Sequence, residues 1–147
     1  MRWAALVTAL MLLGVAAPAV AEHKEIEPAE RRILPWDADI PGCDDTLVLA
    51  EITTRFAERE ARFWNSALRL LAYENIRPTA WRPWRLDHIP RRFCQATAHV
   101  SDGRKRTLFY TVQEDLGTIG SSWGVDWCVV GIDRHWDHAP WCRMARP

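Results

Sequence analysis

The sequence predicts an α+β domain in which one long N-terminal amphipathic helix packs on a four-stranded antiparallel sheet. Apolar residues recur at helical spacing from about residue 45 to residue 73, and after residue 76 the pattern changes to alternation. Two segments with glycine, at 101–104 and 117–124, interrupt the alternating region as hairpin turns do. A helix with a single apolar stripe needs a sheet to cover it, which favours the α+β arrangement.

The first residues have the features of an export signal. Arg2 precedes an apolar run over residues 4–15, which is short for a membrane span of ~20 residues, and Ala19-Val20-Ala21 matches a small-x-small cleavage motif. We therefore expect cleavage between Ala21 and Glu22 and a periplasmic or secreted protein without a transmembrane segment; an uncleaved anchor is the alternative. The expected organisation is a signal peptide over 1–21, an extended lead-in over 22–42 and a single α+β domain over 43–147.

Local signals place the helix and the strands. Asp44 or Asp45 is a good N-cap, because a carboxylate accepts hydrogen bonds from the free amides at a helix start. The helix should end near Asn75, since the residue before Pro78 avoids helical geometry. The first strand belongs at a sheet edge, because its prolines cannot donate ladder hydrogen bonds. The four strands are expected over residues 76–88, 92–100, 106–114 and 125–133.

Alternation within the strands predicts which residues face the helix. In the most consistent register, Cys94, Val112 and Cys128 form one row on the helix-facing side, and Trp127 lies on the outer face. A helix across one face of such a meander is the arrangement of cystatin-like and NTF2-like rolls. A small β-barrel with an added helix is the alternative, but only four strands can be found for it.

The cysteines predict two disulfides, because an exported chain with an even number of cysteines passes through an oxidising compartment. In the expected register Cys94 and Cys128 are two strands apart, roughly 9–10 Å, whereas a disulfide needs Cα atoms within ~7 Å. We therefore expect Cys43–Cys94 and Cys128–Cys142. The second choice is Cys43–Cys128 with Cys94–Cys142.

A histidine beside a carboxylate is the strongest catalytic candidate. The expected register puts His99, Thr107 and Asp133 in one row of the outer face, and a carboxylate can orient a histidine as a general base. Asp126 is the other carboxylate that could take this role. A polar cross-strand ladder is the alternative for the same residues, and no nucleophile is expected beside them.

The C-terminal stretch contains possible metal ligands, namely His135, Asp137 and His138 next to Asp133. Imidazole and carboxylate groups suit zinc or another divalent ion. The spacing matches no compact ligand motif, so we expect no metal and no cofactor. We expect instead a polar turn from which two tryptophans, Trp136 and Trp141, pack back onto the domain; a metal site is the alternative.

Arginine and tryptophan alternate over residues 77–92, and such a strip could bind an anionic partner through guanidinium and indole groups. Residues 22–75 carry an excess of acidic side chains and residues 76–147 an excess of basic ones, but the formal net charge is zero, which disfavours nucleic acid. Stacking within the edge strand is the alternative. The candidate binding residues are Trp81, Arg82, Trp84 and Arg85 of the strip, with Phe109 and Trp127 of the outer face.

Several stretches of the chain resemble a family of small exported proteins of Gram-negative bacteria whose function is unknown. The resembling stretches cover most of residues 43–147 and are CDDTLVLAEITTRFAEREARFW, IPRRFCQATAHVSDGRKRTLFYTV, WGVDWCVVGIDR and APWCRMARP. The resemblance implies a periplasmic location and transfers no catalytic residues.

These features together favour a non-enzymatic periplasmic binding or interaction domain, stabilised by disulfides, for a protein or an anionic envelope component of unknown identity. One alternative is an enzyme of NTF2-like architecture that uses His99 with Asp133 or Asp126 as acid and base. Another alternative is a structural protein of the envelope.

Overall fold

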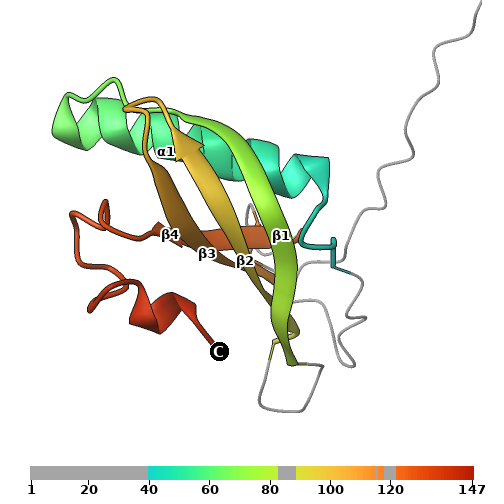
Figure 1. The fold of residues 1–147 in the computed structure, drawn as a ribbon. Helices are drawn as coiled ribbons and strands as arrows, with labels where there is room; N and C mark the ends of the chain where they lie inside the picture. Colours follow the sequence, from blue (N-terminus) through green and yellow to red (C-terminus); the bar gives the residue numbers. More distant parts are fainter. Residues whose placement is uncertain (1–39, 83–88, 115, 118–121) are drawn as a thin grey trace, which may run out of the picture.

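A computed structural model of the chain describes residues 40–82, 89–114, 116–117 and 122–147. The predicted signal peptide, most of the lead-in, and Trp84 and Arg85 lie outside the described residues. The described part is an α+β fold, as predicted, in which one helix precedes an antiparallel sheet (Figure 1). Its elements are α1 (Thr46–Trp64), β1 (Leu70–Arg82), β2 (Arg91–Val100), β3 (Lys105–Gln113), β4 (Gly124–Val129) and the short 3-10 helix η3 (Arg143–Ala145).

Helix α1 begins where the sequence predicts and ends earlier. The Asp45 carboxylate accepts a hydrogen bond from the Leu47 amide at 2.8 Å, which caps the helix start. The predicted end near residue 73 is wrong, because Asn65 adopts a left-handed conformation (φ 46°) and stops the helix after Trp64. The prediction of a long N-terminal helix is therefore corrected to 19 residues that begin at Thr46, well inside the chain.

The strands form one sheet in the order β1-β2-β3-β4, and each pair is antiparallel, so the predicted meander is confirmed. Strand β1 begins at Leu70, earlier than expected, because the shorter helix releases these residues. It lies at a sheet edge and contains Pro78, as the missing amide of proline requires. Strand β4 forms the opposite edge.

The register differs from the prediction in both later hairpins. Cys94 pairs with Tyr110 instead of Val112, a shift of two positions that leaves the faces unchanged. In the next hairpin Tyr110 pairs with Trp127, and this shift exchanges the faces of β4. Trp127 therefore points to the helix and Cys128 away from it. Alternation could not decide between the two registers, because β4 carries buried residues on both faces.

The main core lies between α1 and the sheet. Helix residues Val48, Ile52 and Phe56 recur at intervals of four and are at most 2% exposed. The small residues Ala96 and Ala98 face them from the sheet within the same buried cluster. Fully burying each large side chain stabilises the fold by about 1.5–3 kcal/mol. Within the described residues, no helix has the length and apolar character to cross a membrane.

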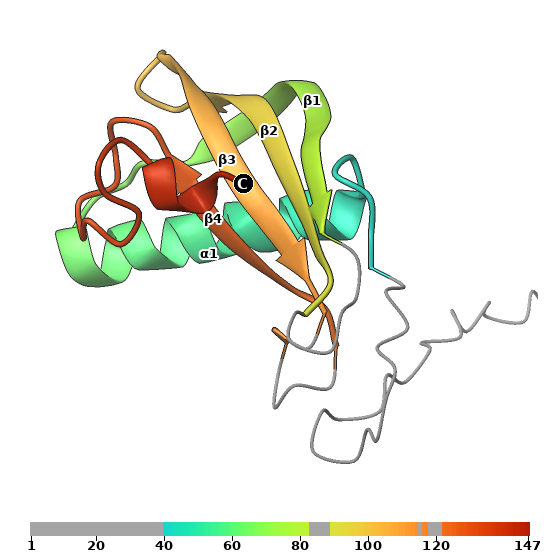
Figure 2. The ribbon, with the colours of Figure 1, turned by 90° about the horizontal axis from the view of Figure 1, so that it is seen from below.

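The other face of β3 and β4 is covered by the chain after β4, here called the C-terminal segment (residues 130–147). Figures 1 and 2 show α1 and this segment on opposite sides of the sheet. A second buried cluster forms where Cys142 and Ala145 meet Cys128, with Phe109 partly buried against them. The sheet is thus covered on both faces at its β4 end, and this end carries the candidate site.

Candidate functional site

Two disulfides hold the fold, and both have the predicted partners. Cys43–Cys94 joins the start of α1 to β2, and Cys128–Cys142 joins β4 to the C-terminal segment, with Cα–Cα distances of 5.7 and 5.6 Å. The prediction that Cys94 and Cys128 share a face is wrong, so their opposite orientation keeps them apart in addition to their distance.

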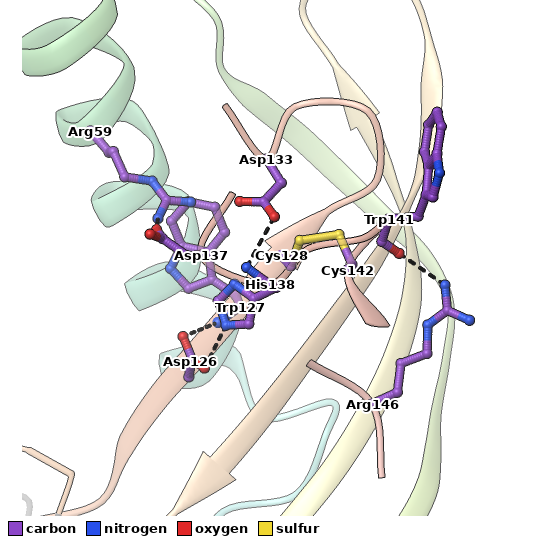
Figure 3. Close-up of a disulfide and its surroundings, with 10 residues drawn as sticks. All are labelled: Arg59, Asp126, Trp127, Cys128, Asp133, Asp137, His138, Trp141, Cys142 and Arg146. Carbon is purple, nitrogen blue, oxygen red and sulfur yellow. Dashed lines mark hydrogen bonds and ion pairs between the residues drawn. A yellow bond between two sulfur atoms is a disulfide. The ribbon is translucent and has the colours of Figure 1, made fainter. Parts of the chain in front are cut away.

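His138 fixes the middle of the C-terminal segment against β4. Its Nε2 donates a hydrogen bond to Asp126 Oδ2 at 2.8 Å, and its backbone amide donates to Asp133 Oδ2 at 3.1 Å (Figure 3). The residue is only 8% exposed. These two contacts hold the backbone of the segment at His138, which lies between Trp136 and Trp141 in the sequence.

A second set of contacts joins the segment to the helix around the free edge of β4. The Arg59 guanidinium lies 3.9 Å over the Trp127 ring and donates to Asp137 Oδ2 at 3.3 Å (Figure 3). Burial lowers the pKa of Arg59, and the charge of Asp137 opposes that shift. Arg55 donates to the carbonyl of Val125 at 3.0 Å. Arg55 therefore occupies a backbone carbonyl of the edge strand β4, while Arg59 links the helix to the C-terminal segment.

The segment encloses one side of a cavity of about 310 Å³, here called the tail pocket. Trp136 and Trp141 are both in its lining and are 72% and 73% exposed. Both have left-handed backbone conformations (φ 59° and 51°), which cost a bulky residue on the order of 1–3 kcal/mol and are concentrated at functional sites. The lining residues are Gly131, Asp133, Arg134, Trp136 and Trp141.

The charged residues of the tail pocket are partly engaged by the protein itself. Asp133 uses one carboxylate oxygen to accept the His138 amide. The Arg134 guanidinium lies 3.3 Å from the buried carboxylate of Glu60 and 5.5 Å over the Trp64 ring. Each side chain retains hydrogen-bonding capacity, since a carboxylate has about four acceptor positions and a guanidinium five donors.

The predicted acid–base pair is not assembled. His99 pairs in the backbone register with Lys105 and not with Thr107, so the predicted row with Asp133 is wrong. The imidazole of His99 lies 2.8 Å from Glu74 Oε1 on β1. Hydrogen bonds from Lys105 and then from His99 lower the pKa of Glu74. His99 instead belongs to a polar cross-strand group with Glu74 and Lys105, and not with the residues that the sequence analysis grouped with it.

The structure brings Asp126 to a different histidine, His138, which the sequence analysis had placed among the metal candidates. The dyad has the geometry of an oriented base, but His138 is buried and does not line the tail pocket. All four cysteines are in disulfides, so none supplies a thiolate nucleophile. The dyad is therefore best explained as a structural clamp.

Each of the possible metal ligands contacts a different part of the protein. The His135 ring meets Phe63 edge-to-face and Trp64 at a tilt, Asp137 pairs with Arg59, and His138 pairs with Asp126. Among the described residues, ligand atoms of Cys128, Asp133 and His138 lie within 4.8 Å of one another. The sulfur of Cys128 is held in a disulfide, and the remaining pair is fewer than the three or four protein ligands of a zinc site.

The predicted binding residues that the structure describes contact other protein side chains. Arg92 stacks over Trp81 at 4.9 Å, and Arg82 stacks over Phe93 at 5.3 Å. Phe109 is covered by Arg146 at 4.4 Å. Trp127 is only 5% exposed, so its expected place on an open outer face is wrong. In the described part of the strip, arginine stacks on aromatic rings between the edge strand β1 and its neighbour β2, and not within the edge strand alone.

Sequence reasoning missed the tail pocket, because it expected Trp136 and Trp141 to pack back onto the domain. The structure leaves both indoles exposed instead. The signal for a site was the gathering of tryptophans in a turn with Pro140, where no strand or helix needs them. The chain matches no protein-family model, no curated protein and no solved structure. The pocket offers two aromatic faces, an acceptor and a donor, which is the chemistry of a binding site.

Proposed function

We propose that the protein is an exported, non-enzymatic binding domain whose ligand occupies the tail pocket. The observation that carries the proposal is the pair of exposed tryptophans, Trp136 and Trp141, in the lining of the cavity. A large aromatic side chain that is exposed to solvent does not stabilise the core by packing. In binding sites such side chains provide much of the contact with the ligand.

The contacts that hold the backbone around the two tryptophans support a binding role. The disulfide at Cys142 is adjacent to Trp141, and Arg146 donates to the Trp141 carbonyl at 3.0 Å. The ion pair of Asp137 with Arg59 is adjacent to Trp136. A site held in its bound shape loses less conformational entropy when a ligand arrives, which raises affinity.

The proposed location is the periplasm of a Gram-negative cell. Two disulfides support an oxidising compartment, and the export signal over residues 1–21 and the resemblance to small exported proteins add to it. Mass spectrometry of the protein recovered from periplasm should find Glu22 as its first residue. Recovery of the full-length chain alone, from the cytoplasm, would contradict export.

The proposed architecture is a roll of the cystatin-like or NTF2-like kind. A helix across one face of an antiparallel meander supports it. In this protein the opposite face is covered at β3 and β4 by the C-terminal segment. We therefore place the proposed binding site in the tail pocket of the C-terminal segment and not on the face of the sheet.

Nuclear magnetic resonance of the indole N–H groups tests the binding proposal directly. The oxidised protein is labelled with ¹⁵N and mixed with size fractions of a periplasmic and cell-wall extract. We expect at least one fraction to shift the signals of Trp136 and Trp141 and to leave that of the buried Trp127 in place. Trp136→Ala and Trp141→Ala assign the two signals and should weaken the response. If no fraction moves either signal, the tail pocket is not a ligand site.

A further inference from the structure

We infer that the ligand of the tail pocket is a neutral carbohydrate, bound through a pyranose ring stacked on the indoles. The inference rests on the proposed function and names the chemical class of its ligand. It combines three properties of the pocket, which are its aromatic walls, its nearly balanced charge and its size.

The aromatic walls suit a ring with an apolar face. Trp136 and Trp141 each present an indole that is more than two-thirds exposed and backed by a fixed backbone. A pyranose carries axial C–H groups on its ring face, and these polarised hydrogens pack on the negative face of an indole. Flat aromatic surface therefore selects a ring-shaped sugar over a flexible chain of the same polarity.

The polar residues of the pocket favour a ligand that both donates and accepts hydrogen bonds. Asp133 can only accept hydrogen bonds and Arg134 can only donate them. A sugar hydroxyl does both, so neighbouring hydroxyls on one ring can satisfy the two side chains together. A buried polar group left without a partner costs about 1–3 kcal/mol, so a purely apolar ligand is disfavoured next to them.

The charge of the site favours a neutral ligand. Arg134 faces the carboxylate of Glu60 at 3.3 Å, and Asp133 is already bound by the amide of His138 at 3.1 Å. Arg134 would repel a cation and Asp133 would attract it, and the reverse holds for an anion. The two opposite charges therefore give the pocket little net attraction for an ion of either sign.

The size of the cavity, about 310 Å³, is at the lower end of the range for small-molecule sites, roughly 300–1,000 Å³. It suits a short sugar unit, such as the end of a glycan. A second cavity of about 330 Å³ lies beside α1, but two of its arginines, Arg55 and Arg59, are held by Val125 and Asp137. The tail pocket is therefore a better candidate than this cavity.

Titration with defined sugars tests the inference. The oxidised protein labelled with ¹⁵N is titrated separately with maltose, cellobiose and diacetylchitobiose. We expect at least one of them to shift the indole signals of Trp136 and Trp141 with a Kd on the order of 1 mM or tighter. Trp136→Ala and Trp141→Ala should each weaken that affinity by about tenfold or more, since each removes a stacking face. Trp136→Phe, which keeps an aromatic ring, should retain part of it.

The controls separate this inference from the proposed function. Trp81→Ala removes an indole outside the pocket and should leave the affinity unchanged. Sorbitol has the hydroxyls of a sugar without its ring, so an equal response to sorbitol would overturn the stacking argument. Shifts caused by tetramethylammonium or phosphocholine, and by none of the sugars, would overturn the neutral-sugar assignment. If a cell-wall fraction moves the two signals but none of these sugars does, the carbohydrate inference fails and the binding function stands.

Discussion

Replacement of Trp127 by alanine should destabilise the protein strongly. Its indole is 5% exposed, packs 5.6 Å from the Phe56 ring and lies 3.9 Å beneath the Arg59 guanidinium. A buried tryptophan removes about 150–250 Å² from water, which at ~25 cal/mol per Å² corresponds to roughly 4–6 kcal/mol as an upper estimate. Residual burial in the unfolded chain lowers this by roughly 10–40%. We expect a loss of about 3–5 kcal/mol in the free energy of unfolding.

The measurement is urea unfolding of the oxidised protein, followed by circular dichroism, for wild type, Trp127→Ala and Trp136→Ala. The slope against urea should stay the same, so that the midpoint reports stability. Trp136→Ala is the matched control, because its indole is 72% exposed and its loss should change stability by no more than about 0.5 kcal/mol. A loss below about 1 kcal/mol for Trp127→Ala would place that indole at the surface and refute the register of β3 with β4.

Two further predictions concern pH and use the same unfolding assay. Burial raises the pKa of Tyr110 above its ordinary value of 10.0, and its hydroxyl donates to the Cys43 carbonyl. The stability that the buried Tyr110 hydroxyl contributes is therefore complete below pH 10.0 and declines as the pH rises beyond that value. The free energy of unfolding of Tyr110→Phe should fall less steeply at alkaline pH than that of the wild type. An equally steep fall would argue against the burial of this hydroxyl. Lys105 and His99 lower the pKa of Glu74 below 4.5, so its contribution is present above 4.5 and is lost as the pH falls through the lowered pKa. In Glu74→Gln the free energy of unfolding should therefore fall less as the pH is lowered. If its dependence on acid pH is the same as in the wild type, the contacts of Glu74 with Lys105 and His99 do not contribute to stability.

The parts of the fold that depend on residues close together in the sequence could be predicted from it. Asp45 caps the helix through an amide two residues away, and Gly103 takes the positive φ of 79° that the first hairpin turn needs. The end of the helix was missed, because apolar spacing continues past Asn65 and only the left-handed conformation of that residue ends it. Propensity is a weak guide when the same residues can also pair as a strand.

The candidate site could be predicted only as a set of residues. The ion pair of Arg59 with Asp137 joins positions 78 apart in the chain, and its partners lie on a helix and in an irregular segment. The pairing of His138 with Asp126 depends on the face of β4, which alternation assigned incorrectly. The sequence could not predict that Trp136 is exposed, because its position depends on the contacts that bind the C-terminal segment to α1 and to β4.

The two disulfides should have separable effects on stability and on the tail pocket. Chain entropy predicts that Cys43–Cys94, which spans 51 positions, contributes about 4 kcal/mol and Cys128–Cys142, which spans 14, about 3 kcal/mol. Only the second bridge is adjacent to a pocket indole, that of Trp141.

The double variant Cys43→Ser/Cys94→Ser should therefore lose more stability in urea and keep the wild-type position and order of the Trp141 indole N–H signal. The double variant Cys128→Ser/Cys142→Ser should lose less stability and show a shifted, more mobile Trp141 signal. The Trp141 signals of the two variants are compared in the absence of urea, where each variant is folded. A difference between them then does not result from global unfolding. If the second variant keeps an unaltered Trp141 signal, the bridge does not hold the pocket and Trp141 is positioned by its other contacts. If instead the first variant disturbs Trp141 as much as the second does, the two ends of the sheet are coupled and the pocket is not a separate rigid unit.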